Sequence, residues 1–113
     1  MQSEAPRFEN LVASHLLKWV HFEQDTQGRD LELRYFRDVD GREVDFIVTE
    51  RRKPILAVEA KWSDAPVEPA LRYFKERFPE VAAWQVSATG TKDYRSAEGI
   101  RVAPALTFLR TLV

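Results

Sequence analysis

The chain has 113 residues, 44% hydrophobic and 31% charged, which is enough for one globular domain with a real core and too few for two. It contains no cysteine, which excludes disulfides, thiolate zinc sites and cysteine nucleophiles. Its 17 basic residues nearly balance its 18 acidic ones, which argues against a strong, autonomous nucleic-acid binder but leaves room for an enzyme that meets DNA through a local patch.

The first half of the chain predicts one helix followed by three strands. The helix covers residues 6–24, because apolar side chains recur there at the helical period. The strands cover residues 31–39, 42–50 and 54–62. The first two strands are joined by Asp40-Gly41, a strong hairpin signal, and the last two by the basic turn Arg51–Lys53.

The second half of the chain predicts a shorter alternation of helices and strands. In order, these are a helix at 67–78, a strand at 81–88, a polar loop at 90–99, a short strand at 100–102 and a helix at 104–113. We therefore expect a single α/β domain over residues 1–113. Its core would have the order α-β-β-β-α-β, with a mixed central sheet flanked by helices.

The hairpin register places the apolar residues of the first two strands. A two-residue turn at Asp40-Gly41 sets Leu33 opposite Val48 and Tyr35 opposite Phe46. These side chains then share one apolar face of the sheet, and the same alternation adds Val44 to it.

The second turn places charged residues opposite one another. A turn at Arg51–Lys53 sets Asp45 across from Glu59 and Glu43 across from Lys61, although a shift by two residues stays open. Two carboxylates directly opposite each other have Cβ atoms roughly 4.5–5.5 Å apart, and like charges there are destabilising. In a purely structural sheet such a pair is unfavourable, whereas a bound divalent cation would neutralise the two charges and make the pair favourable.

Glu59-Ala60-Lys61 therefore indicates a metal site. Mg²⁺ or Mn²⁺ would take carboxylate oxygens from Asp45 and Glu59, with the carbonyl of Ala60 as a third ligand. Lys61 lies on the same face as Glu59, because strand side chains alternate. It would orient the attacking water, help to deprotonate it or stabilise charge on the phosphate. The nearby carboxylates favour a charged Lys61, whereas burial and a bound cation oppose it, so the sequence does not determine whether Lys61 is charged.

Glu9 and Gln85 are accessory candidates. Glu9 falls beside Leu16 and Val20 on a helical wheel, so it would approach the same sheet face as an extra metal ligand. A first-turn glutamate equally well complements the helix dipole. Gln85 is the only amide of the 81–88 strand and would orient a water or phosphate, unless it is a structural buried amide.

These residues together resemble the PD-(D/E)XK nuclease-like superfamily, in which the Asp and Glu bind Mg²⁺ and the Lys assists the nucleophilic water. The segments Phe8-Glu9-Asn10-Leu11, Arg42-Glu43-Val44-Asp45-Phe46 and Val58-Glu59-Ala60-Lys61 are more closely similar to the C-terminal domain of unknown function of prokaryotic AAA-type ATPases. The resemblance covers most of residues 7–95. It implies a restriction-endonuclease-like fold with Glu9, Asp45, Glu59 and Lys61 as the site.

The resemblance also frames the function. The ATPase part of such proteins contains a phosphate-binding loop and this sequence has none, so we expect an excised or stand-alone C-terminal domain. The leading hypothesis is a Mg²⁺- or Mn²⁺-dependent DNA endonuclease-like domain associated with an AAA-type ATPase. The alternatives are a catalytically silent domain that regulates or docks onto that ATPase, and a domain that binds DNA without cleaving it. We expect a cytoplasmic location and no membrane partner, because no signal peptide or membrane-length apolar run is evident.

Overall fold

The computed structural model describes residues 4–113 as a six-stranded mixed sheet with three α-helices. The strand order is β1-β2-β3-β4-β6-β5. Strands β1, β2 and β3 are antiparallel neighbours, β3, β4 and β6 are parallel, and β5 returns antiparallel to β6. The elements are α1 (Glu4–Gln27), β1 (Leu31–Arg37), β2 (Glu43–Glu50), β3 (Lys53–Lys61), α2 (Pro69–Arg77), β4 (Ala82–Ser87), β5 (Tyr94–Arg95), β6 (Arg101–Pro104), α3 (Ala105–Leu109) and the 3₁₀ turn η1 (Arg110–Leu112). The predicted α/β class and element order are confirmed.

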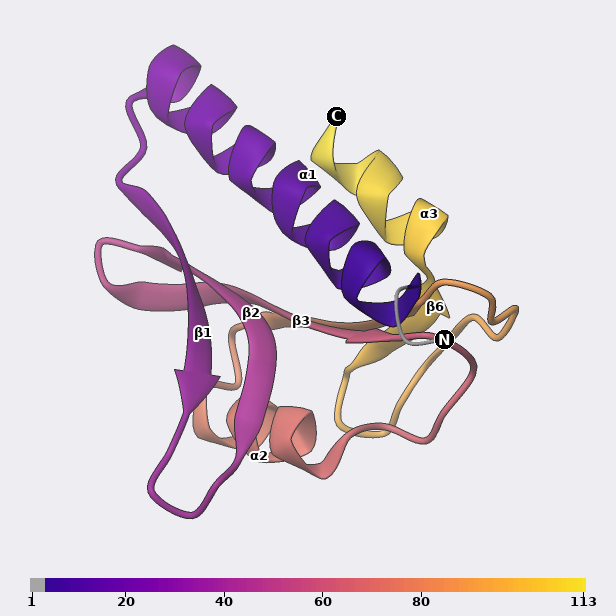
Figure 1. The fold of residues 1–113 in the computed structure, drawn as a ribbon. Coiled ribbons are helices and arrows are strands. Elements are labelled where there is room, and N and C mark those ends of the chain that lie inside the picture. Colours follow the sequence, from indigo (N-terminus) through magenta and orange to yellow (C-terminus); the bar gives the residue numbers. More distant parts are fainter. Residues whose placement is uncertain (1–3) are drawn as a thin grey trace.

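Helices cover both faces of the sheet. α1 and α3 lie together on one face, and α2 lies on the other (Figure 1). The α1 side of the core contains Val48, Val58 and Val86 from three neighbouring strands. The α2 side contains Ile47, Ala57 and other residues of the opposite parity. Each central strand is therefore buried on both faces, as parallel crossovers require.

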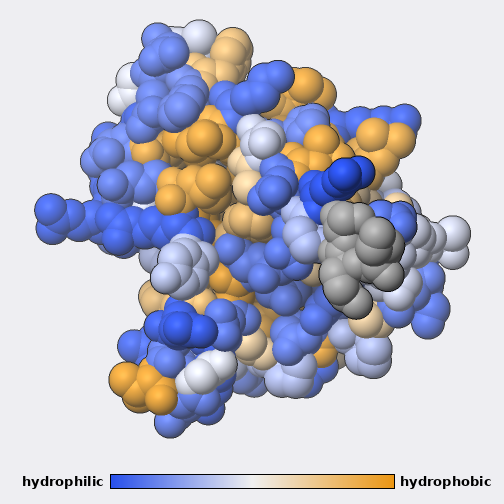
Figure 2. Space-filling model, viewed as in Figure 1, coloured by the Kyte–Doolittle hydropathy of each residue, from blue (hydrophilic) through white to orange (hydrophobic). Residues whose placement is uncertain are grey.

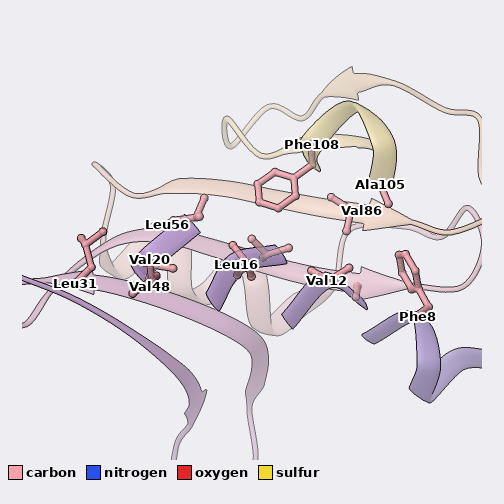
Figure 3. Packing of buried hydrophobic residues seen from close by; sticks show 12 residues of the cluster. Phe8, Val12, Leu16, Val20, Leu31, Val48, Leu56, Val86, Ala105 and Phe108 are labelled. Atoms are coloured by element: carbon pink, nitrogen blue, oxygen red, sulfur yellow. The ribbon is translucent and has the colours of Figure 1, made fainter. Parts of the chain in front are cut away.

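A four-residue spacing holds α1 against the sheet. Phe8, Val12, Leu16 and Val20 are its buried residues, and they point from the helix toward the strands (Figure 3). This spacing produces one apolar stripe along a helix of 3.6 residues per turn. The helix ends at Gln27, and Gly28 directly after it has a φ of 65°, the left-handed conformation that commonly closes a helix. Within the described residues, no helix is long and apolar enough to cross a membrane.

The hairpin between β1 and β2 differs from the predicted two-residue turn. Its loop is closed by backbone hydrogen bonds from Asp38 N–H to the Arg42 carbonyl and from Gly41 N–H to the Asp38 carbonyl. Leu33 pairs with Val48 as predicted, but closer to the loop Phe36 pairs with Val44. One extra residue must therefore lie in β2, where Asp45 and Phe46 together oppose a single β1 residue.

This β-bulge corrects two predictions about the sheet faces. Val44 lies on the α2 side of the core and not with Val48, because the extra residue reverses the alternation. Tyr35, predicted to share the apolar face with Phe46, is 71% exposed. Bulges are common beside functional sites, where they redirect a side chain. This one lies at Asp45.

The β2–β3 turn is tighter than predicted. Glu50 pairs with Lys53, so Arg51 and Arg52 alone form the turn, and a second irregularity follows next to Thr49. Both arginines have positive φ, 52° and 71°, as a two-residue type I′ turn requires. The irregularity next to Thr49 offsets the shorter turn by one residue, so Phe46 still pairs with Val58.

The end of the chain follows the predicted order with two differences. The polar loop at 90–99 contains the two-residue strand β5, which pairs with β6. The last helix is shorter than predicted, and its final turn is a 3₁₀ turn.

Candidate functional site

The candidate site lies where β2 and β3 part. Their regular pairing stops at Phe46 and Val58. Beyond this pair, side chains take over the hydrogen bonds: Asp45 N–H donates to Glu59 Oε1 over 3.2 Å, and Ala60 N–H donates to Asp45 Oδ2 over 2.9 Å. Each carboxylate thus accepts a hydrogen bond from the backbone of the other residue's strand. Asp45 and Glu59 therefore lie close together, as the predicted register of β2 and β3 required.

Lys61 is also in the site, but Glu68 is its nearest partner. Lys61 Nζ lies 2.5 Å from Glu68 Oε2 and 3.7 Å from Glu59 Oε2. Glu43, predicted across from Lys61, instead pairs with Arg37 of β1 and forms an ion pair with its guanidinium. The reason is the parting of the strands, which ends the register before it reaches Lys61.

Gln85 holds the segment that carries Glu68. Its Oε1 accepts a 2.8 Å hydrogen bond from Glu68 N–H, and its Nε2 donates to the carbonyls of Ala65 and Pro66. Gln85 is only 2% exposed. All of these bonds go to backbone groups of the irregular segment before α2. The amide thus acts here as a structural anchor, the alternative that the sequence left open.

The two carboxylates are electrostatically strained. Burial, followed by the neighbouring charge of Asp45, raises the pKa of Glu59 to about 7. Burial also raises the pKa of Asp45, and the hydrogen bond from Ala60 N–H offsets this in part. Like-charged groups that share a buried site resist ionising together. A cation at this position would relieve the strain.

Lys61 is cationic. Burial opposes its charge, but the hydrogen bond to Glu68 and the charges of Glu59 and Asp45 outweigh burial, so the pKa of Lys61 is raised above its usual value. The ammonium therefore remains charged at neutral pH.

A pocket of about 480 Å³ opens over these groups. Asp45, Glu59 and Lys61 line it, together with residues of the β1–β2 loop and of the start of α2. The charged residues that line it are Asp40, Arg42, Glu43, Asp45, Glu59, Lys61 and Glu68. Its volume falls in the range of small-molecule binding pockets.

Glu9 lies on α1 in line with Leu16 and Val20, as the helical wheel predicted, but it is exposed whereas those two residues are buried. It is nevertheless close to the site, because partial burial and the charge of Asp45 raise its pKa, while the charge of Lys61 lowers it. Its role as a metal ligand stays a prediction.

The donor set fits a hard divalent cation with few protein ligands. Across residues 4–113, no three acidic or histidine side chains are arranged as a ready-made metal cage. Mg²⁺ is commonly held by one or two carboxylates and otherwise by water and substrate oxygens. Asp45 and Glu59 can supply those two carboxylates. Ala60 contacts Asp45 through its amide, and its carbonyl as a ligand stays a prediction.

Glu68 is the site residue that sequence reasoning missed. It lies in the irregular segment between β3 and α2, where strand alternation gives no direction for a side chain. The available signal was weak: an acidic residue directly before Pro69, the first residue of α2. Prolines are common at that position of a helix and fix its start, but they do not identify a functional neighbour.

Replacing Gln85 tests the anchor. Gln85→Met should lower the free energy of unfolding by about 3 kcal/mol, because three hydrogen bonds worth roughly 1 kcal/mol each are lost in a buried place. Gln24→Met is the matched control, since the exposed Gln24 makes one such bond, to the Leu31 carbonyl. Urea unfolding measures both changes. Equal effects of the two substitutions would contradict an anchoring role.

Comparison with known proteins places the chain in a family. No curated protein and no solved structure matches it. The family model described as Domain of unknown function (DUF4143) matches residues 6–108, which include every candidate site residue. The chain therefore belongs to the DUF4143 family.

Proposed function

We propose that this domain is a Mg²⁺- or Mn²⁺-dependent nuclease that hydrolyses phosphodiester bonds in DNA. The observation that carries the proposal is the pair Asp45 and Glu59, two carboxylates held side by side with raised pKa values and a charged lysine beside them. A purely structural sheet gains nothing from that arrangement. The resemblance of Asp45 and Glu59-Ala60-Lys61 to the motif of PD-(D/E)XK nucleases supports the proposal.

The residues take the following roles. Asp45 and Glu59 hold the ion, with the Ala60 carbonyl and Glu9 as additional ligands. The ion, when bound, acts as a Lewis acid on the phosphate and favours ionisation of water. Lys61 is charged, so it donates hydrogen bonds to a phosphate oxygen and stabilises the negative charge that grows there as water attacks. Glu59 Oε2 lies 3.7 Å from Lys61 Nζ, so Glu59 would contact the lysine as well as hold the ion.

The wider setting belongs to the same proposal. We place the domain in the cytoplasm as the partner of an AAA-type ATPase, in the same chain or another. The ATPase would bring DNA to the pocket, which compensates for the near-neutral charge of the domain.

The test is metal binding and cleavage by the purified domain. Calorimetric titration should show Mn²⁺ binding at millimolar concentration or below, and supercoiled plasmid or branched DNA should be cut with Mg²⁺ or Mn²⁺ and left intact with EDTA. A domain that binds neither metal at millimolar concentration would overturn the proposal.

A second candidate, docking onto the ATPase without catalysis, is favoured by a different surface. A groove of about 720 Å³ runs between α1 and the C-terminal turn, lined by apolar side chains that include Trp19, Phe22, Leu109 and Leu112. Figure 2 shows hydrophobic residues beside α1 and α3 on this face, among largely hydrophilic neighbours. Phe22, which lines this groove, is 60% exposed, and contiguous exposed apolar patches commonly mark interaction sites. Absence of Mn²⁺ binding would favour this function.

A further inference from the structure

The ammonium group of Lys61 lies closer to Glu68 than to the carboxylate pair. Its ion pair with Glu68 measures 2.5 Å, whereas its ion pair with Glu59 Oε2 is longer, at 3.7 Å. Among the described residues, Lys61 forms no ion pair with Asp45. A flexible lysine next to the buried Glu59 and the half-buried Asp45 would otherwise move closer to them, because a poorly paired buried charge is costly.

The backbone of Glu68 is fixed on both sides of the residue. Its N–H donates to Gln85, and its carbonyl accepts hydrogen bonds from Leu71 N–H and Arg72 N–H in the first turn of α2. Its side chain forms no capping hydrogen bond with the helix. The carboxylate of Glu68 is therefore free to bind Lys61. The backbone of Glu68 is fixed, so the ion pair cannot shift toward β2 by a movement of this segment.

We propose that Glu68 is a positioning residue that limits how closely Lys61 approaches the Asp45–Glu59 pair, so that these two carboxylates remain open to a divalent cation. The inference rests on the proposed function, because it assigns Glu68 a task in that same site. Without Glu68, the ammonium moves toward Glu59 and Asp45 and competes with the metal. Gln85 contributes indirectly, since it fixes the backbone that carries Glu68.

The metal-binding test compares two substitutions that remove the same charge from the same pocket. Glu68→Gln and Glu43→Gln each remove one carboxylate from its lining, but only Glu68 contacts Lys61. In Mn²⁺ titrations at constant pH, Glu68→Gln should weaken binding about tenfold. Glu43→Gln should weaken it only about twofold.

The double variant separates competition by Lys61 from the loss of charge. In Lys61→Met/Glu68→Gln no ammonium remains to compete, so Mn²⁺ affinity should return to within about threefold of wild type. Equal effects of Glu68→Gln and Glu43→Gln would overturn the inference. So would a Glu68→Gln defect that persists when Lys61 is replaced.

A metal-free measurement keeps this inference separate from the proposed function. In ¹⁵N-detected spectra of side-chain ammonium groups, the Lys61 signal is assigned by its loss in Lys61→Met. It should shift in Glu68→Gln and stay in place in Glu43→Gln, with circular dichroism confirming that both variants are folded. If wild type binds no Mn²⁺, the nuclease proposal and this inference both fail. If wild type binds Mn²⁺ and the signal does not move in Glu68→Gln, only this inference fails.

Discussion

The free energy of unfolding of the metal-free domain should fall by about 3 kcal/mol between pH 4.5 and pH 8 through Glu59 alone. Its pKa is raised from 4.5 to about 7 in the folded state by burial and by the charge of Asp45. Each unit of pKa shift corresponds to about 1.4 kcal/mol of preference for one protonation state. The folded protein thus prefers the protonated carboxyl group.

The sign follows from the protons bound in each state. Between pH 4.5 and about 7, the folded state keeps the proton on Glu59 while the unfolded state has released it. Stability therefore decreases as pH rises through this window. Below pH 4.5 both states are protonated, and well above pH 7 both are ionised, so the contribution is constant outside it. Asp45, whose pKa is also raised, changes stability in the same direction.

Urea unfolding of wild type and Glu59→Gln at several pH values isolates this contribution. The amide cannot ionise, so the stability of Glu59→Gln relative to wild type should increase by about 3 kcal/mol from pH 4.5 to pH 8. Glu32→Gln, at an exposed position of β1, is the control and should run parallel to wild type. Parallel curves for Glu59→Gln would show that Glu59 is not strained.

Metal should reverse the trend. A divalent cation binds the ionised carboxylates, so its affinity should rise with pH up to about 7, where Glu59 loses its proton. Saturating Mn²⁺ should then remove most of the loss of stability at pH 8. The electrostatic repulsion that destabilises the metal-free protein would thus favour its metal-bound form.

Strand alternation made much of this site predictable. Alternation with period two places Glu59 and Lys61 on one face of a strand, and the turn signals limit which residues of the neighbouring strand lie across from them. The contact between Asp45 and Glu59 was predicted on that basis and is present. The register survived because the irregularity next to Thr49 adds one residue and thereby offsets a turn that is one residue shorter than predicted, before the strands reach the pair formed by Phe46 and Val58.

Strand alternation and turn signals did not predict the β-bulge at Asp45. A single extra residue changes the parity of everything between it and the hairpin loop, which is why Val44 and Tyr35 were assigned to the wrong surroundings. Local sequence gives little warning, because a bulge is stabilised by contacts across the sheet. Glu68 was missed for a related reason: its place is fixed by Gln85, a contact 17 residues away.

Asp45→Asn and Lys61→Met should each lower the rate of DNA cleavage by about 10²–10⁴-fold, for different reasons. Asp45→Asn removes one of two carboxylates that hold the ion, so it should also weaken Mn²⁺ binding by about tenfold or more. Lys61→Met removes a cation 3.7 Å from Glu59, so Mn²⁺ binding should be unchanged or tighter.

Lys61→Arg distinguishes the role of the lysine. If Lys61 acts as a charged donor to phosphate, as its raised pKa indicates, arginine keeps the charge and should retain part of the activity. If Lys61 acts as a base, arginine cannot replace it and activity should fall to the level of Lys61→Met. Lys18→Met is the control for loss of a lysine, because Lys18 lines the groove between α1 and the C-terminal turn and not the candidate site. Cleavage that survives both Asp45→Asn and Lys61→Met would mean that the activity does not arise from this site.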